Sequence, residues 1–203
     1  MYNEAITILK TLNKYGFEGY IVGGYPRDKY LGIESNDIDI CTNANVEELK
    51  KICNIDKEYK EYGNVIIDDI QITTYRKDTY LKNRNDVIIE YVNTLQEDLK
   101  RRDFIINTLC IDMNGNYVDL MGAKKDIDNK IIRMIGSTER LKEDPLRILR
   151  ALRFKSELKF DLDPDLDKAI KKYSYLVNNL SNNKKDKELK RIDKELIDEY
   201  LRW

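Results

Sequence analysis

The stretch Gly23-Gly24-Tyr25-Pro26-Arg27-Asp28 decides how this chain of 203 residues is interpreted. Its two glycines end the apolar run Tyr20-Ile21-Val22 and open a predicted helix that carries Arg27. A helix start without Cβ atoms lets the backbone approach a phosphate group closely, and its N–H groups favour negative charge. The stretch therefore predicts a strand, a tight turn and a helix start suited to phosphate.

Two aspartates follow in the run Asp37-Ile38-Asp39-Ile40-Cys41, which predicts a strand over 37–41. Alternate residues of a strand point to opposite faces, so the carboxylates of Asp37 and Asp39 are expected on one face. Paired carboxylates are ligands for Mg²⁺, and two such ions clamp an in-line phosphoryl displacement. Alone, a Gly-Gly pair is ordinarily a turn and an Asp-x-Asp pair a solvated strand face. Their combination, with Arg27 between them, favours a site that transfers a nucleotide from a triphosphate.

The amino-acid composition limits the classes of protein to which the chain can belong. Hydrophobic residues make up 41% of the chain, which supports a real core. The 36 basic and 37 acidic residues leave a net charge of −1, so contact with RNA has to come from local clusters such as Lys100-Arg101-Arg102. The absence of histidine excludes Ser-His-Asp and Cys-His catalysis and histidine metal sites.

The cysteines and the apolar runs predict the compartment. Cys41, Cys53 and Cys110 are widely spaced in apolar surroundings, so we expect reduced core residues and no disulfide framework. The start of the chain is unlike a signal peptide, and no apolar run approaches the ~20 residues that span a bilayer. We therefore expect a cytoplasmic protein without membrane contact.

The order of patterns predicts an α+β fold, in which a mixed β-sheet flanked by helices precedes an all-helical region. Helices are expected at 4–15, about 25–31, 45–53 with Asn45 as the cap, and 101–108. Strands are expected at 19–22, 37–41, 65–67, 70–75 and 87–92, with Asp68-Asp69 at the turn between the third and the fourth. A hairpin joined at 114–116 and a mobile polar loop at 77–86 are also expected. Further helices are expected from Asp144-Pro145 onward, near 163–177 and near 185–201. We expect the domains to be 1–136 and 137–203.

A second cluster consists of Arg102, Asp103 and Asn107. On the predicted helix, Asp103 and Asn107 are i and i+4 and share one face, where they can engage the hydroxyls of a ribose. Arg102 would then reach a phosphate. The alternative is an ordinary surface helix with an Arg–Asp pair.

The third cluster contains Asp144 and Arg147, with Arg150 one turn further on. Cytosine and adenine both place an amino group beside an unprotonated ring nitrogen, so a carboxylate and a guanidinium at i and i+3 match that edge. Uracil and guanine present the opposite pattern and would leave both protein groups unpaired. The alternative is an i, i+3 salt bridge worth a few tenths of a kcal/mol.

Five ordered motifs carry a family resemblance over roughly residues 15–180. They are Gly23-Gly24-x-x-Arg27-Asp28, Asp37-x-Asp39, Thr74-Tyr75-Arg76, Arg101-Arg102-Asp103-Phe104-x-x-Asn107 and Glu143-Asp144-Pro145-Leu146-Arg147-Ile148-Leu149-Arg150. In this order they resemble class II tRNA nucleotidyltransferases (CCA-adding enzymes) and bacterial poly(A) polymerases. The resemblance implies a nucleotidyltransferase head and a helical neck that add CMP or AMP, from CTP and ATP, to an RNA 3′ end with Mg²⁺.

The same resemblance implies a role for each matching residue. Asp37 and Asp39 would be catalytic and would hold the metal. The nucleotide-binding residues would be Gly23, Gly24, Arg27, Arg102, Asp103, Asn107, Asp144, Arg147 and Arg150. The RNA implied is tRNA, at its CCA end.

Other interpretations stay open from the sequence. One is a poly(A)-type, A-only or C-only adding enzyme, and another is a truncated homologue that binds nucleotide or RNA without catalysis. Relatives usually continue into body and tail domains, so a second subunit or a missing domain is also expected. This chain has Gln71 where the family often has glutamate, and Asn182-Asn183-Lys184-Lys185 where it often has Glu-Arg.

Overall fold

The computed structural model describes residues 1–82 and 84–201, and its chain divides by contacts into two compact units. Unit 1 consists of Met1–Asp78, Ile89–Arg102 and Ile106–Lys124. Unit 2 consists of Thr79–Ile88, Asp103–Ile105 and Lys125–Trp203. The functional boundary expected between residues 136 and 137 stays a prediction.

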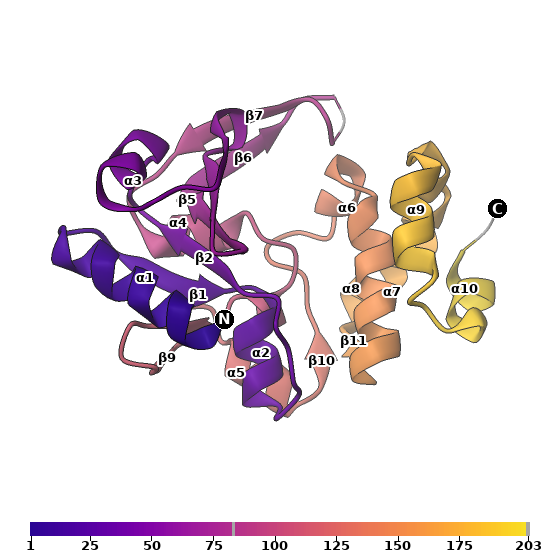
Figure 1. Cartoon of the computed structure of the whole chain (residues 1–203). Helices are drawn as coiled ribbons and strands as arrows, with labels where there is room; N and C mark the ends of the chain where they lie inside the picture. Colours follow the sequence, from indigo (N-terminus) through magenta and orange to yellow (C-terminus); the bar gives the residue numbers. More distant parts are fainter. Residues whose placement is uncertain (83, 202–203) are drawn as a thin grey trace. The chain divides into compact units, whose positions relative to one another are not determined.

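Unit 1 is built on a seven-stranded mixed sheet in the order β3-β4-β5-β2-β1-β8-β9. Figure 1 labels β1, β2, β5 and β9 of this sheet. Only β2 and β5 pair in parallel, and the other neighbours are antiparallel. The strands are β1 (Gly19–Val22), β2 (Asp39–Thr42), β3 (Lys57–Tyr59), β4 (Asn64–Ile67), β5 (Ile70–Thr74), β8 (Cys110–Ile111) and β9 (Tyr117–Val118). The helices and turns of unit 1 include α1 (Tyr2–Lys14), α2 (Gly24–Tyr30), α3 (Val46–Ile52), η1 (Lys60–Tyr62) and α4 (Leu95–Lys100). The α+β class with a mixed sheet is confirmed.

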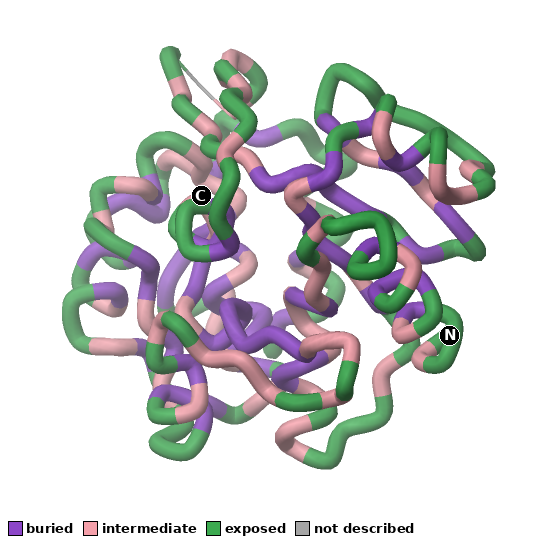
Figure 2. The backbone as a smooth tube through the Cα atoms, turned by 90° about the vertical axis from the view of Figure 1, so that its left-hand side faces the viewer, coloured by how far each residue is buried: buried purple, intermediate pink, exposed green. Residues whose placement is uncertain are grey.

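Strand alternation gives the sheet two apolar faces. One face packs Ile21, Ile40 and Ile111 against apolar residues of α1 and α3. The other face packs Val22, Cys41 and Cys110 against Leu95 and Leu99 of α4. All three cysteines are free; Cys41 and Cys110 are buried, as predicted for core residues, whereas Cys53 is only half-buried. Figure 2 shows that exposed residues follow the turns and the outer helical faces.

Several local predictions for unit 1 are confirmed. Asn45 caps α3 in a reciprocal capping box with Glu48, because each side chain accepts the other's backbone N–H. Asp68 and Asp69 both have positive φ in the turn between β4 and β5. The strand register places Asp39 opposite Val22 of β1 on one side and opposite Gln71 of β5 on the other.

The prediction of a loop over 77–86 is wrong in its first part. Residues Arg76–Tyr80 form β6, which pairs with β7 (Val87–Tyr91) in a two-stranded sheet. The strand lacks an apolar face, but ion pairs support it. Arg76 lies 3.0 Å from Asp78, and Lys77 lies 3.8 Å from Glu90. Periodicity of apolar residues does not detect such a strand.

The predicted helix at 101–108 is also wrong. The side chain of Thr94 caps α4 by accepting from the backbone of Glu97, and α4 ends at Lys100. The chain then bends, Phe104 forms a β-bridge with Met134, and only a short 3₁₀ turn, η2 (Ile105–Asn107), follows. Asp103 and Asn107 therefore do not share a helix face.

Unit 2 is mainly helical, with α7 packed against α9 and α10. It contains β10 (Ile131–Ile132), α6 (Arg140–Glu143), α7 (Leu146–Leu158), β11 (Asp161–Leu162), α8 (Pro164–Tyr173), η3 (Ser174–Asn179), α9 (Asn182–Leu189) and α10 (Lys194–Tyr200), and α5 (Ala123–Asp128) leads into it. The expected all-helical region includes β11, which pairs in parallel with β10. The helix expected near 185–201 is two helices, because the backbone N–H of Asp193 donates to Ser156 between them.

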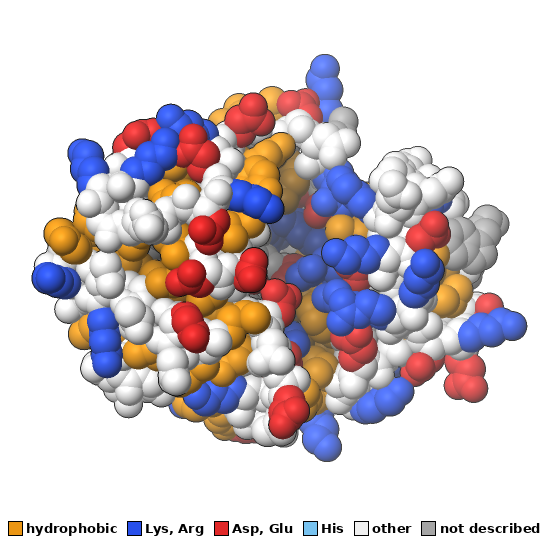
Figure 3. Space-filling view, viewed as in Figure 1, with side chains coloured by type: hydrophobic (Ala, Val, Ile, Leu, Met, Phe, Trp, Pro, Cys, Tyr) orange, Lys and Arg blue, Asp and Glu red, His pale blue; other side chains and the backbone are white. Residues whose placement is uncertain are grey.

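The surface follows the composition. Figure 3 shows acidic and basic side chains interspersed, in keeping with the net charge of −1. Among residues 1–82 and 84–201, no helix combines the length and the hydrophobicity needed to cross a membrane.

Candidate functional site

The two aspartates of unit 1 lie at the start of β2. Asp39 is the first residue of the strand, whereas Asp37 precedes it, so the predicted strand 37–41 begins two residues later and ends at Thr42. The ladder starts at the pair Val22–Asp39 because Gly23 turns away from it with φ 88°. Burial still alternates, since Ile38 and Ile40 are buried and the two aspartates are not.

The glycine turn comes close to Asp39. Gly23 has φ 88° and ψ −135°, a conformation that only glycine adopts readily, and it caps α2. A Cβ at residue 23 would lie 3.5 Å from Oδ2 of Asp39. A Cβ on Gly24 would lie 3.4 Å from Nη2 of Arg27. Both distances are those of ordinary van der Waals contacts, so it is the positive φ of residue 23 that requires glycine.

Arg27 is held in place by two acceptors. Its side chain is buried, with the residue 6% exposed. Nε and Nη2 donate to Oδ1 of Asp28 at 2.8 and 2.6 Å, and Nη1 donates to Oδ1 of Asn107 at 2.6 Å. The structure thus joins Arg27 to Asn107, which the sequence motifs place in separate clusters.

Arg102 is bound to an aspartate that sequence reasoning missed. Asp98 is 0% exposed and accepts from Nε of Arg101 at 2.8 Å, from Nη2 of Arg102 at 3.0 Å and from the backbone N–H of Arg76 at 3.2 Å. Burial opposes ionisation of Asp98, but the guanidinium groups of Arg102 and Arg101 outweigh it and lower its pKa. The spacing of Asp98 from Arg101 and Arg102, i+3 and i+4, is the signal that could have found it.

Asp37 and Asp39 provide the donors that a divalent cation would take. Carboxylate oxygens suit Mg²⁺, and the glycine turn leaves room beside Asp39. Asp37 is exposed and makes no hydrogen bond or ion pair within residues 1–82 and 84–201. No group of three or more His, Cys, Asp or Glu suited to a metal occurs in that part of the chain.

In unit 2, Asp103 and Arg150 form a close pair. Oδ2 of Asp103 accepts from Nε and lies 2.6 Å from Nη2 of Arg150, while Oδ1 accepts from the backbone of Phe104. The charge of Asp103 raises the pKa of Arg150. Asp103 precedes the short turn η2 and Asn107 ends it, so the two residues do not lie on one α-helix as predicted.

Asp144 and Arg147 lie where α6 ends and α7 begins, yet they do not pair with each other. Oδ1 of Asp144 accepts from the backbone of Leu146 at 3.0 Å and lies 3.2 Å from Nη1 of Arg84. Nη1 of Arg147 donates to the carbonyl of Arg140 at 2.8 Å and to Oε2 of Glu143 at 3.2 Å. The simple i, i+3 salt bridge is therefore not the arrangement observed.

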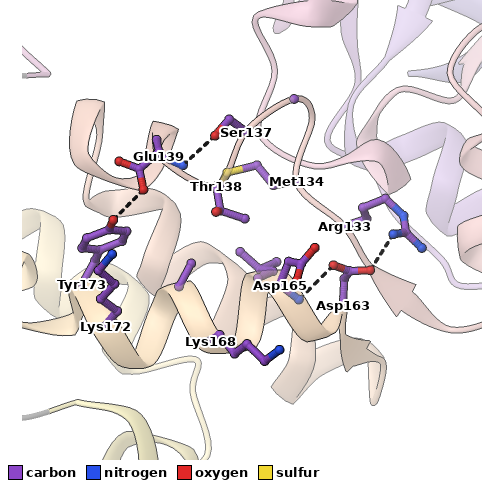
Figure 4. Close-up of a pocket in the computed structure, with 13 residues that line it drawn as sticks. Arg133, Met134, Ser137, Thr138, Glu139, Asp163, Asp165, Lys168, Lys172 and Tyr173 are labelled. Carbon is purple, nitrogen blue, oxygen red and sulfur yellow. Dashed lines mark hydrogen bonds and ion pairs between the residues drawn. The ribbon is translucent and has the colours of Figure 1, made fainter.

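Unit 2 also contains a cavity of about 510 Å³, shown in Figure 4. Its walls come from residues 133–139 and from α8, and none of the predicted site residues lines it. Tyr173 donates to Glu139 at 2.5 Å across one end, and Arg133 pairs with Asp163 at the other. Charges of both signs are matched within the cavity walls, so this cavity does not single out a ligand.

Known proteins resemble this chain in sequence and in structure. The family described as "Poly A polymerase head domain" matches residues 19–133. The CCA-adding enzyme of Ligilactobacillus salivarius is 42% identical over 188 residues, which are 89% of this chain and 46% of that protein. The CCA-adding enzyme of Bacillus subtilis is 36% identical over 93% of this chain and 49% of its own length. The chain thus spans about half the length of the curated relatives it matches.

Solved structures give the same result. The Bacillus stearothermophilus CCA-adding enzyme in complex with CTP has a TM-score of 0.84 and 33% identity, covering 94% of this chain and 48% of that one. A tRNA nucleotidyltransferase complexed with a primer tRNA and an incoming ATP analog has a TM-score of 0.76 and 31% identity, covering 95% and 60%. With the ordered motifs, the mixed sheet and the match over residues 19–133, the chain belongs to the poly A polymerase head domain family.

Proposed function

We propose that this chain is the catalytic part of an RNA nucleotidyltransferase that adds CMP and AMP to the 3′ end of a tRNA. The observation that carries the proposal is the placement of Asp39, at the start of β2 and beside the Gly23 turn. The relatives that the chain matches over about half of their length are CCA-adding enzymes, and one related structure contains CTP. Both facts support this activity over simple nucleotide binding.

Asp37 and Asp39 would hold Mg²⁺, which fits their hard oxygen donors. When bound, the metal supplies Lewis-acid stabilisation of the charge that develops on the transferring phosphoryl group. In the reaction, the RNA 3′-hydroxyl oxygen forms a bond to the α-phosphorus of the nucleotide. The bond from that phosphorus to the bridging oxygen breaks, pyrophosphate leaves, and a carboxylate takes the hydroxyl proton. No histidine is required for these steps.

Arg27 and the two glycines would bind the triphosphate. Because Asp28 and Asn107 already fix the guanidinium of Arg27, its charge would be preorganised and little side-chain entropy would be lost on binding. In this proposal, Asn107 acts through Arg27. Arg102 would be held for a phosphate by Asp98, and Asp103 and Arg150 would serve the sugar and phosphates as one ion pair.

Asp144 and Arg147 would read the base. The carboxylate would accept from the exocyclic amino group of cytosine or adenine, and the guanidinium would donate to the adjacent ring nitrogen. Arg147 is 4% exposed, so a base that left it unpaired would incur the full cost of burying an unsatisfied donor. This preference for CTP and ATP over UTP and GTP needs no nucleic-acid template.

The test is to incubate the protein and Mg²⁺ with a tRNA transcript that ends before CCA, giving each labelled nucleotide separately and then CTP with ATP. We expect CMP addition from CTP alone, AMP addition once CMP is in place, and no addition from UTP or GTP. Asp39→Asn, which keeps the size of the side chain and removes its charge, is the control. Equal use of all four nucleotides, or nucleotide binding with no transfer, would contradict the proposal.

A further inference from the structure

Gln71 of β5 lies beside Asp39 in the sheet of unit 1. The two residues are register partners in the parallel pairing of β5 with β2. Register partners on neighbouring strands project from the same face of a sheet, and the strands are about 4.8 Å apart. The amide of Gln71 therefore projects next to the carboxylate of Asp39.

The packing of the alternate residues gives the same direction. Ile70 and Ile72, on either side of Gln71, belong to the same buried core cluster as Ile40, the residue after Asp39. Consecutive side chains of a strand point to opposite faces. Gln71 and Asp39 therefore both point away from that cluster, so register and burial agree on a shared face.

This part of the sheet face is open to a ligand. Gln71 is the only exposed residue of β5, although β5 lies between β4 and β2 and is not an edge strand. Its exposure therefore shows that the face above it is uncovered. The side chain of Gln71 makes no hydrogen bond or ion pair within residues 1–82 and 84–201. An uncommitted amide thus stands in the open space beside Asp39.

We propose that Gln71 is a third oxygen donor, through Oε1 of its amide, to the divalent cation that Asp37 and Asp39 would hold. This inference rests on the proposed function, which assigns the cation to the two aspartates. Amide oxygens, like carboxylate oxygens, are ligands for hard divalent cations. Because this donor is neutral, the site requires no third acid among the described residues.

A neutral third donor also sets the charge of the site. Two carboxylates balance a divalent cation, and the amide of Gln71 adds no charge, whereas a glutamate there would leave an excess negative charge. The number of charged ligands tunes the affinity of an oxygen site for its cation. A carboxylate at residue 71 should therefore tighten cation binding, and an apolar side chain of similar size should weaken it.

The experiment measures the Kd of Mn²⁺ without nucleotide, from the electron paramagnetic resonance signal of free Mn²⁺, and that of Mg²⁺ by competition. Gln71→Glu should bind Mn²⁺ about tenfold more tightly than the wild type, and Gln71→Leu about fivefold more weakly. The matched control is Gln96→Glu, because Gln96 is an exposed glutamine of α4 in the same unit. Its Kd should stay within about twofold of the wild-type value.

The two substitutions at residue 71 separate a donor from a long-range charge effect. A donor role requires Gln71→Leu to weaken binding, because this change removes the oxygen and leaves the net charge unaltered. An unchanged Kd for Gln71→Leu would overturn the proposal, even if Gln71→Glu bound more tightly. Circular dichroism spectra that match the wild type establish that both variants are folded during the titration.

Asp39→Asn separates this inference from the proposed function. If Asp39→Asn abolishes Mn²⁺ binding and Gln71→Leu leaves it unchanged, the aspartate site stands and only the role of Gln71 is overturned. If Asp39→Asn leaves Mn²⁺ binding unchanged, the metal assignment of the proposed function fails, and this inference fails with it.

Discussion

The aspartate pair of unit 1 and the proposed base-reading cluster of unit 2 are held in place in different ways. In unit 1, the backbone sets the geometry, since Asp39 is fixed by its register with Val22 and the turn beside it by the φ of Gly23. In unit 2, side-chain ion pairs set it, since Arg84 holds Asp144 and Glu143 holds Arg147. Few substitutions at the aspartates of unit 1 should leave any activity. Substitutions in the cluster of Asp144 and Arg147 should instead lower nucleotide selectivity by degrees.

The largest effect is expected from breaking the carboxylate pair. Asp37→Ala and Asp39→Ala should each lower incorporation of CMP about a thousandfold or more, because a lost metal ligand removes several kcal/mol of transition-state stabilisation. Single-turnover rates with tRNA and CTP measure this, and the unfolding transition should be unchanged. Glu34→Ala is the matched control, since Glu34 is an exposed acid in the segment before β2. Near-normal incorporation by either aspartate variant would refute the metal assignment.

The next largest effect is expected on stability. It concerns the ion pairs of Asp98 with Arg101 and Arg102, which are side-chain contacts within unit 1. Asp98→Asn should lower the free energy of unfolding by about 3 kcal/mol, because it leaves the partly exposed Arg101 and Arg102 facing a neutral group. Urea denaturation at neutral pH measures the change. Asp165→Asn, at an exposed position, should change stability by less than about 0.5 kcal/mol.

The pH dependence of the stability difference between wild type and Asp98→Asn tests the direction of the pKa shift of Asp98. The pKa of Asp98 is lowered in the folded protein, so its ionised form stabilises the fold above the pKa of an unfolded aspartate, about 3.9. That contribution is lost as the pH falls toward the lowered folded pKa. The difference between wild type and Asp98→Asn should therefore be present at pH 7 and shrink below about pH 4. A difference that grew with acidity would contradict the assignment.

A smaller effect on stability tests whether the backbone at Gly23 sets the geometry beside Asp39. Gly23→Ala should reduce stability by about 1–3 kcal/mol, since φ 88° strains any other residue, and relief of that strain should shift the turn that lies beside Asp39. Gly32→Ala is the control, because Gly32 has φ 72° with no atom near the added Cβ. Both variants should be destabilised in thermal unfolding, but only Gly23→Ala should lose activity at a temperature where both are folded. Equal losses of activity in Gly23→Ala and Gly32→Ala would contradict a specific role of the Gly23 turn.

The sequence predicts the backbone-determined features well, because their signals are local. β1, the start of α2, the Asn45 cap and the Asp68-Asp69 turn follow from short patterns and are confirmed. β6 escaped prediction because its residues are polar and its support comes from ion pairs. The helix expected at 101–108 failed because Thr94 starts α4 earlier and Asp98 binds the arginines that follow.

The residues of the candidate site also fall into those with a local sequence signal and those without one. The glycine turn, Asp39 and the order of the arginine motifs are readable from spacing alone. The partners are not, since Asn107 for Arg27, Asp103 for Arg150 and Arg84 for Asp144 each come from a distant part of the chain. No periodicity links such positions, and only the fold brings them together. The roles of Gly23, Gly24, Arg27, Arg102, Asp103, Asn107, Asp144, Arg147 and Arg150 toward a nucleotide stay predictions.

The most direct test of base-selective transfer is the rate of incorporation of all four nucleotides by the wild-type protein and by Arg147→Ala. The wild type should use CTP and ATP and discriminate strongly against UTP and GTP. Arg147→Ala should lose about 1–3 kcal/mol of transition-state stabilisation for the correct bases and less for the wrong ones, so that discrimination narrows. A uniform loss across the four nucleotides would contradict base reading and leave Arg147 as a structural or phosphate contact.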